Sequence, residues 1–409
     1  MSEPVIQHLE QQLSIQSLKL NALLEITSAI NSNAGVDSLL AIYAFILKEQ
    51  LLHRKFVLFI KQEDWNCPVK VGYKGKITLD EHLPDLLRFK ETTFLSDSNS
   101  TLLREFQTVI PVYHSDQPLA YLLIGEARNT TKNHPVDKDL DFTQTLTNII
   151  CVAIENKGLE RSLLAKERIN KDLEVASELQ KLLFPSNLPS NRKMDVSAKY
   201  VSREVVSGDY YDFIPLGDEE YIICIADVSG KGVSAALLMA NFQATIRALF
   251  RYQRFDLSFL IEELNKKVVL SAQGEKFITF FIAHYNAFTR TLKYINAGHN
   301  QPLLTIGKKH QLLHDGCIGL GMLDELPNIK VGKLFLPPKS TLVLYTDGVV
   351  ELENEEGEAY GLERMIKNIQ AFSSLKMEDT NNILFSKLDE WKGRLPYGDD
   401  TAILSCKFF

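Results

Sequence analysis

The sequence predicts an α+β protein in which two folded parts are joined by a long charged helix. Helices, short strands and a closing helix follow one another in the first part, and this order favours an antiparallel sheet packed against helices. The second part, after Pro189, is rich in strands with long helices between groups of them, which indicates helices stacked on sheets. With 409 residues, the chain has room for two or three domains of ordinary size.

Composition and charge are those of a soluble globular protein. Apolar residues make up 45% of the chain and charged residues 24%, which excludes disordered and fibrous classes. The net charge of −7, without any basic run, disfavours nucleic acid as a partner. The 5 cysteines lie far apart with no CxxC pair, which suits a reducing cytoplasm better than a disulfide framework or a zinc site. With no signal-peptide pattern and no apolar run of the ~20 residues that span a bilayer, we expect a cytoplasmic protein without a membrane span.

The first part is predicted to begin with two helices. Apolar residues recur at steps of three, four and seven positions over residues 5–30, and a second helix is expected at 36–52. A third helix is expected after Pro135, running toward Gly158. Between the second and third helices, short apolar runs predict strands at 55–61, 108–113 and 119–125, the last two separated by a turn.

Residues 159–183 carry a narrow apolar stripe among charges of both signs. The stripe consists of Leu159, Leu163, Ile169, Leu173, Ala176, Leu179 and Leu183. Two interpretations stay open, namely the seam of a coiled coil, which Lys166 and Asn170 interrupt, and an amphipathic helix lying on its own domain. A helix continuous from residue 141 to 183, with Gly158 as its weakest point, would be on the order of 65 Å long. Because such a helix is poorly stable alone, we expect a homodimer that pairs it with the same helix of a second chain.

The second part is predicted as groups of strands with helices between them. Strands are expected at 194–200, 209–215, 221–227, 277–286, 291–297, 303–306, 340–345 and 401–408. Helices are expected at 232–250, 256–270, 361–371 and 379–392. An apolar strand fixes its terminal residue at the edge of a sheet, so side chains at the ends of several strands can meet.

Carboxylates stand at the ends of four of these strands. Asp209 opens one strand and Asp227 closes the next, just before a loop that contains glycine. Asp347 follows a third strand, and the pair Asp399-Asp400 precedes the last. Gathered carboxylates repel one another unless a cation neutralises them, and hard divalent ions such as Mg²⁺ or Mn²⁺ prefer oxygen ligands.

Each motif also has an ordinary structural reading. Asp347 before a glycine is typical of a turn, the pair Asp399-Asp400 fits a solvated loop, and Asp227 fits a helix N-cap. The segment Gly230-Lys231-Gly232 lacks the GxxxxGK[ST] spacing of a phosphate loop. The four motifs carry weight together because they occur in order and each lies at a strand end.

Residues 175–409 resemble the PPM/PP2C-type serine/threonine phosphatases, in the bacterial branch of sporulation phosphatases and stress-response sigma regulators. The matching stretches, in family order, are 178–185, 207–212, 226–232, 296–300, 346–349 and 398–400. The resemblance implies a domain at 186–409 with a β-sandwich flanked by helices and a binuclear Mn²⁺ or Mg²⁺ centre. Two departures stand out, Ser207 where the family usually has glycine and Ala402 where it usually has threonine. Since every acid is present, we expect an active enzyme.

The resemblance also implies the roles of the acids. Catalysis would proceed through a metal-activated water held by Asp209, Asp227, Asp347 and Asp399, with the backbone carbonyl of Val228 and the Asp400 carboxylate as further ligand candidates. Which of Asp399 and Asp400 is the ligand stays open. A metal pair ~3.5–4 Å apart would lower the pKa of the water and neutralise the phosphoryl oxygens, so no covalent intermediate is required. Two readings stay open for His299, a general acid and a buried or turn-stabilising residue.

Substrate and sensor follow from resemblance as well. The family implies phosphoserine or phosphothreonine on a small regulatory protein, such as an anti-sigma-factor antagonist, as the substrate. The first part resembles a GAF sensor domain in its strands at 110–113 and 121–125 and in the closing helix that ends at 157. This implies a GAF-like sensor at 15–158 that binds an unknown small ligand or protein, and a helical linker at 159–185. Cys67 and Cys151 are expected to be core or surface thiols rather than a chromophore site.

Two other classes of function use the same residues. The acids would also suit a metal-dependent nuclease or nucleotide hydrolase, which the acidic net charge and the missing basic groove disfavour. A noncatalytic signalling scaffold would need only the sandwich, and the retained acids disfavour it.

Overall fold

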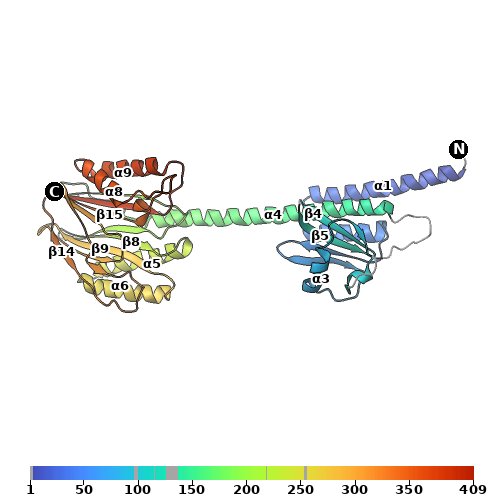
Figure 1. The fold of residues 1–409 in the computed structure, drawn as a ribbon, viewed down its shortest axis with the longest axis horizontal. Coiled ribbons are helices and arrows are strands. Elements are labelled where there is room, and N and C mark those ends of the chain that lie inside the picture. Colours follow the sequence, from blue (N-terminus) through green and yellow to red (C-terminus); the bar gives the residue numbers. More distant parts are fainter. Residues whose placement is uncertain (1–2, 96–99, 115, 126–136, 218, 253–255) are drawn as a thin grey trace. The chain divides into compact units, whose positions relative to one another are not determined.

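The computed structural model describes residues 3–95, 100–114, 116–125, 137–217, 219–252 and 256–409 (Figure 1). The chain divides into two compact units, Met1–Arg168 and Ile169–Phe409, and the boundary falls inside the helix α4 (Asp137–Lys181). Both units combine helices with sheets, which confirms the predicted fold class.

The first unit contains one antiparallel sheet with strands in the order β2-β1-β5-β4-β3. Its elements before α4 are α1 (Glu3–Asn31), α2 (Val36–Phe45), a π-helical turn (Ile46–Gln50), β1 (Phe56–Lys61), β2 (Trp65–Val71), α3 (Leu79–Leu86), β3 (Thr93–Phe94), a 3₁₀ turn (Leu103–Glu105), β4 (Thr108–His114) and β5 (Gln117–Ile124). The predicted helices and strands of this unit are confirmed to within a few residues, and α4 continues through Gly158, as in the continuous helix considered for residues 141–183. β2, α3 and β3 were not predicted.

Both faces of this sheet are buried. In β1, Phe56 and Leu58 face a core shared with α1, α2 and α4, while Val57 and Phe59 face a second core that includes Leu86 of α3. Because a strand buried on both faces has no polar side, the run FVLFI shows no alternation of apolar and polar residues.

The second unit is a sandwich of two sheets. Its elements are β6 (Met194–Val201), β7 (Tyr210–Gly217), β8 (Glu220–Val228), α5 (Val233–Tyr252), α6 (Leu257–Ala272), β9 (Ile278–Asn286), β10 (Thr291–Ala297), β11 (Leu303–Ile306), β12 (Lys309–Leu312), β13 (Gly316–Cys317), β14 (Gly332–Phe335), β15 (Ser340–Tyr345), α7 (Asp347–Val350), α8 (Leu362–Ala371), α9 (Met377–Lys392) and β16 (Thr401–Phe408). One sheet has the order β13-β10-β9-β8-β7, with β14 paired to β10, and the other has the order β12-β11-β15-β16-β6. All predicted strands and helices of this part are present; β12, β13, β14 and α7 are additional.

Helices cover the outer face of each sheet (Figure 1). Side chains such as Phe281 and Leu404 fill the space between the sheets. The helices α5 and α6 pack on the first sheet through residues such as Phe242, and α8 and α9 pack on the second through residues such as Phe385. The second unit therefore has four layers, which leaves the strand ends as the place where side chains of both sheets can meet.

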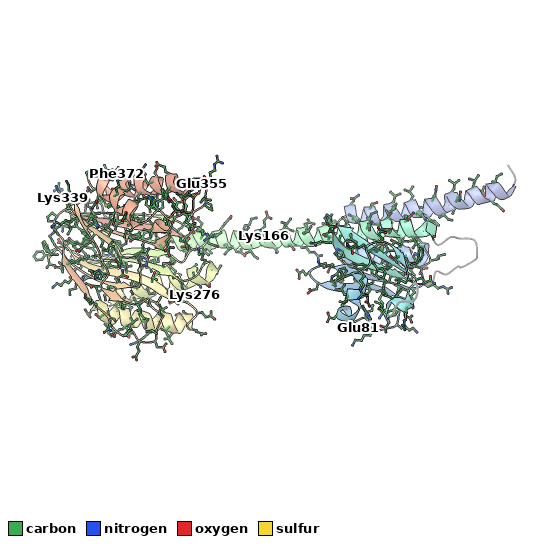
Figure 2. All side chains as sticks on the ribbon, viewed as in Figure 1. Glu81, Lys166, Lys276, Lys339, Glu355 and Phe372 are labelled. Atoms are coloured by element: carbon green, nitrogen blue, oxygen red, sulfur yellow. The ribbon has the colours of Figure 1, made fainter. Side chains whose placement is uncertain are left out.

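Helices α4 and α5 both expose apolar side chains. Within the described residues, α5 is the one helix long and apolar enough to cross a membrane by length and composition, and it also packs Met239, Phe242 and Ile246 into the core. Along α4, Leu163 and Leu179 are 67% and 61% exposed, and Lys166 extends away from the helix (Figure 2). The middle of α4 is thus not covered by its own chain.

Candidate metal centre

The strand pairing brings the acids together in two groups, two carboxylates on one sheet and three on the other. Antiparallel β7 and β8 pair Tyr210 with Ala226, so Asp209, before β7, lies beside Asp227, near the end of β8. Antiparallel β15 and β16 pair Tyr345 with Ile403, so the end of β15 meets the start of β16. Asp347 begins α7 directly after β15, and Asp399-Asp400 directly precede β16. We call these five carboxylates, Asp209, Asp227, Asp347, Asp399 and Asp400, the acid cluster.

The two groups face one another closely enough to interact. Burial, followed by the charges of Asp227 and Asp400, raises the pKa of Asp209 well above its ordinary value. Burial and the charges of Asp347, Asp399 and Asp400 raise the pKa of Asp227 to about 7. Burial and then Asp399 raise the pKa of Asp347 in the same way. For Asp209 and Asp227, carboxylates at the strand ends of the other sheet add to the effect of burial, whereas the charge that raises the pKa of Asp347 comes from Asp399 on its own sheet. A bound cation would relieve this repulsion.

Two close backbone contacts hold the acid-bearing loops in place. A Cβ on Gly208 would lie 3.0 Å from the carbonyl oxygen of Val228, so the loop before Asp209 packs directly on the end of β8. A Cβ on Gly348 would lie 2.1 Å from the carbonyl oxygen of Asp400, which no side chain could tolerate. Glycine is therefore required beside Asp347 for its turn to lie against the loop before β16.

Asp399 and Asp400 have different partners. Asp400 accepts a hydrogen bond from the Ser207 hydroxyl at 2.5 Å and one from the backbone N–H of Arg203 at 2.9 Å. The same Ser207 oxygen accepts the backbone N–H of Asp209 at 3.0 Å. Asp399 instead contacts its neighbour's backbone N–H and the side chain of Lys231, whose Nζ lies 2.7 Å from Oδ2. Asp400 thus braces the loop of Asp209, whereas Asp399 faces an exposed lysine.

The donor chemistry of the cluster fits a hard divalent ion, although the side chains do not form a closed ligand shell. Asp209 is 2% exposed, and its Oδ2 is buried with no hydrogen-bond partner. A buried carboxylate oxygen without a donor is one that a cation can satisfy. Across the described ranges, no group of three or more His, Cys, Asp and Glu side chains is arranged to hold a metal ion as it stands.

His299 and the cysteines take structural positions. His299 is buried, its Nδ1 lies 2.9 Å from the Thr279 hydroxyl, and burial lowers its pKa to about 4. Its location agrees with the reading as a buried residue. Burial raises the pKa of the Cys67 thiol to about 11 and that of the Cys151 thiol to about 12, so both are protonated thiols at neutral pH.

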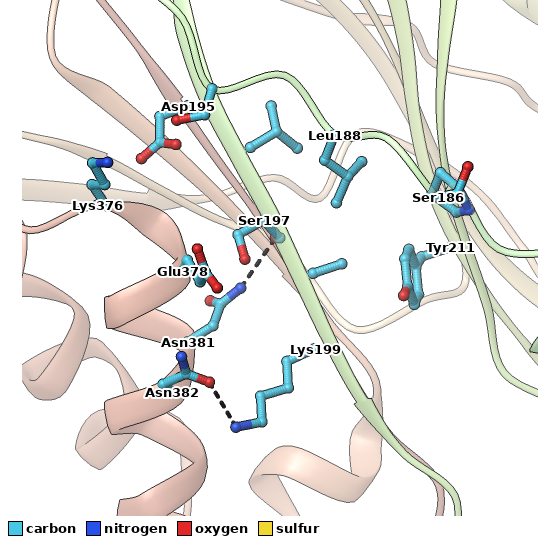
Figure 3. Close-up of a pocket in the computed structure, with 14 residues that line it drawn as sticks. Ser186, Leu188, Asp195, Ser197, Lys199, Tyr211, Lys376, Glu378, Asn381 and Asn382 are labelled. Atoms are coloured by element: carbon cyan, nitrogen blue, oxygen red, sulfur yellow. Dashed lines mark hydrogen bonds between the residues drawn. The ribbon is translucent and has the colours of Figure 1, made fainter.

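A cavity of about 750 Å³ lies elsewhere in the second unit, between β6, the start of α9 and the segment 185–190 (Figure 3). Asn381 donates to the carbonyl of Ser197 at 3.1 Å, and Lys199 donates to Asn382 at 2.7 Å across its wall (Figure 3). None of the acid cluster lines this cavity. We therefore place the candidate site at the strand ends and not in the cavity.

Sequence reasoning missed several residues around the acids. Ser207 and Lys231 lie in the matching stretches 207–212 and 226–232, but no role was predicted for either side chain. Gln180 lies in the matching stretch 178–185 and Arg203 in none of them, and no role was predicted for either, because a contact between a helix end and a distant loop leaves no periodicity in the sequence. The glycines on both sides of Lys231 were a hint that its loop has a special backbone.

Comparisons with known proteins agree with this geometry. Residues 217–409 match the family of Stage II sporulation protein E (SpoIIE). The chain is 31% identical over 219 residues to phosphoserine phosphatase RsbU of Bacillus subtilis, covering 52% of this chain and 64% of that protein. It is 28% identical over 269 residues to protein IcfG of a Synechocystis species, covering 58% of this chain and 42% of that protein. The chain thus spans about two thirds of one of these relatives and less than half of the other.

A solved structure shows the same fold. The SiaA-PP2C domain of Pseudomonas aeruginosa superposes with a TM-score of 0.54 at 22% identity, covering 60% of this chain and 99% of that domain. Together with the sequence match, this likeness identifies the second unit of the chain as a SpoIIE-type domain with the PP2C fold.

Proposed function

We propose that this chain is a metal-dependent protein serine/threonine phosphatase of the PPM type, acting on a phosphorylated regulatory protein. The observation that carries the proposal is the meeting of two groups of carboxylates from two sheets, with the buried Oδ2 of Asp209 left without a hydrogen-bond partner among them. Carboxylates that are held so close together that their pKa values rise are typical of a functional site.

The ligands of a binuclear Mn²⁺ or Mg²⁺ centre would be Asp209, Asp227, the carbonyl of Val228, Asp347 and Asp399. Bound ions of this kind lower the pKa of water and neutralise the oxygens of a phosphoryl group, which is the chemistry that phosphomonoester hydrolysis needs. The chain's own part is to hold these oxygens at fixed strand ends. Gly208 lets the Asp209 loop pack on the end of β8, and Gly348 lets the Asp347 turn pack on the loop before β16, so the carboxylates within each group are held in place.

Asp399 is the better ligand candidate of its pair. Both carboxylate oxygens of Asp400 are engaged by Arg203 and Ser207, which belong to the loop that leads to Asp209. Asp399 Oδ2 has only the exposed Lys231 as its partner. If Asp400 turned toward a metal ion, it would lose its hydrogen bonds to the loop that leads to Asp209. Asp399 could exchange Lys231 for a metal ion and leave that loop unchanged.

The substrate class rests on the relatives. Two of them, RsbU and RsbP of Bacillus subtilis, carry the name phosphoserine phosphatase. We infer a phosphoserine or phosphothreonine substrate on a protein such as an anti-sigma-factor antagonist.

The first unit is proposed as a GAF-like sensor at 15–158 that controls the phosphatase at 186–409 through the linker 159–185, in a cytoplasmic protein. The exposed apolar stripe of α4 supports a homodimer formed through the linker rather than a helix lying on its own domain. The linker's end contacts the second unit, where Gln243 of α5 donates to the carbonyl of Leu183 at 3.2 Å. An unknown small ligand or protein at the sensor would then shift the linker between two arrangements.

To test this proposal, the full chain is assayed with p-nitrophenyl phosphate, a phosphoserine peptide and single-stranded DNA, each with and without Mn²⁺. The proposal expects Mn²⁺-dependent release of phosphate from the first two and no cleavage of the third. Cleavage of DNA would favour a nuclease, and inactivity on all three would favour a scaffold.

A further inference from the structure

Lys231 brings a positive charge to the acid cluster. Its Nζ lies 2.7 Å from Asp399 Oδ2, and its charge also opposes the rise in the pKa of Asp347. The ammonium group of Lys231 therefore interacts with carboxylates on two loops. The two side chains are 43% and 40% exposed, so the pair lies at the rim of the cluster and not in its buried centre.

The loop that carries Lys231 is fixed by its neighbours. Ser229 N donates to the carbonyl of Phe277 at 2.9 Å, and Phe277 N donates to Ser229 Oγ at 2.9 Å. Lys276 Nζ donates to the carbonyl of Ser229 at 3.0 Å. These bonds tie the loop to the start of β9, so that the base of the Lys231 side chain has a defined place.

Glycines on both sides make this loop possible. Gly230 and Gly232 have φ of 83° and 74°, in the region that other residues rarely adopt. A Cβ at Gly230 would in addition lie 2.6 Å from Lys276 Nζ. The glycines let the loop turn under Lys276 and present Lys231 toward Asp399.

We propose that Lys231 is a resident counter-cation of the acid cluster that competes with a divalent ion for Asp399. Both oxygens of Asp399 are engaged, Oδ1 by the N–H of Asp400 and Oδ2 by Lys231, so an ion bound at Oδ2 has to displace the ammonium. An exposed ion pair is weak, and this exchange is accordingly easy. The inference rests on the proposed metal site and adds that its affinity is set partly by a lysine.

The test is a calorimetric titration of the full chain with Mn²⁺. Lys231→Gln removes the competing charge and should bind Mn²⁺ at least about threefold more tightly at low salt. The gain should shrink at high ionic strength because the rim is exposed. Lys231→Arg, which keeps the charge, should bind like the wild type.

Lys330→Gln is the matched control. Lys330 Nζ also lies 2.7 Å from a carboxylate, that of Asp315, which is outside the acid cluster. Its Mn²⁺ affinity should equal that of the wild type. Unchanged or weaker binding by Lys231→Gln overturns the inference, as does a failure of the wild type to bind Mn²⁺. If Lys231→Gln binds more tightly while no protein hydrolyses a phosphoester, the counter-cation role stands and the phosphatase proposal fails.

Discussion

The side-chain amide of Gln180, in the last turn of α4, makes two hydrogen bonds with the backbone of Ser207. Its Nε2 donates to the carbonyl at 2.8 Å, and its Oε1 accepts the N–H at 3.0 Å. Ser207 in turn bonds Asp400 through its hydroxyl and receives the N–H of Asp209. The end of the linker helix is thus two hydrogen bonds away from the acid cluster, which gives the proposed linker control a physical route.

Gln180→Ala should uncouple the helix from this loop. Each of the two hydrogen bonds contributes about 0.5–1.5 kcal/mol to stability. We therefore expect the free energy of unfolding of the second unit, measured with urea, to fall by about 1–3 kcal/mol. Phosphatase turnover should fall at least tenfold, because the Asp209 loop is no longer held. Glu178→Ala, at an exposed position of the same turn, is the control and should change neither quantity. Equal behaviour of the two variants would show that the contact is incidental.

Arg247→Met should destabilise the second unit strongly. Arg247 donates from Nε and Nη2 to the two oxygens of the fully buried Asp212, at 2.7 and 3.0 Å. Removing the guanidinium leaves a buried carboxylate without its cation, which costs about 3 kcal/mol. Adding Asp212→Asn should recover part of that loss, and Lys387→Met at an exposed pair should have little effect. Thermal unfolding that fails to separate Arg247→Met from Lys387→Met would contradict this account.

His299 should make stability depend on pH in mildly acidic solution. Its pKa is lowered by burial to about 4 in the folded chain, against an unfolded value near 6.5. As the pH falls, His299 therefore binds a proton in the unfolded chain before it does so in the folded chain. The contribution of neutral, buried His299 to the stability of the fold is complete above about pH 6.5 and is lost as the pH falls toward 4. The full contribution is about 3 kcal/mol. His299→Asn, which keeps a group near Thr279, should show a shallower loss of unfolding free energy between pH 7 and 4.5 than the wild type, and parallel curves would refute the prediction.

The linker proposal predicts a dependence on helical phase. Inserting one to four residues near Glu167 rotates the end of α4 by about 100° per residue, and phosphatase activity should vary with that rotation. Leu173→Asp combined with Leu179→Asp should weaken the dimer. A monomer by light scattering at micromolar concentration, with activity indifferent to insertion length, would leave the helix as a passive tether.

The ends of the strands could be predicted from the sequence, whereas the contacts of the side chains at those ends could not. The apolar runs before Asp227 and Asp347 located β8 and β15 because a buried strand needs consecutive apolar residues. β2 was missed because its sequence WNCPVKV contains a proline and no clear alternation. Gly158 did not end α4, since its exposed position costs only about 1 kcal/mol relative to alanine.

The difference in surroundings between Asp399 and Asp400 could be seen only in the three-dimensional structure. Neighbours in sequence with the same side chain differ only in what their carboxylates meet, here Lys231 for one and Ser207 with Arg203 for the other. Local pattern carries no information on either contact, because both join segments far apart in the chain.

The central claim is that the acid cluster forms a metal-dependent hydrolytic site, and Asp227→Asn tests it most directly. The measurement is Mn²⁺-dependent turnover of p-nitrophenyl phosphate by the full chain, with Asp315→Asn as the control for a carboxylate outside the cluster. We expect EDTA to abolish wild-type turnover and Mn²⁺ to restore it. Asp227→Asn should lower the Mn²⁺-dependent turnover by several orders of magnitude, because it removes a proposed metal ligand. It should not lower the melting temperature, because it also removes one of several neighbouring like charges. Undiminished turnover by Asp227→Asn, or wild-type turnover that survives EDTA, would contradict the account.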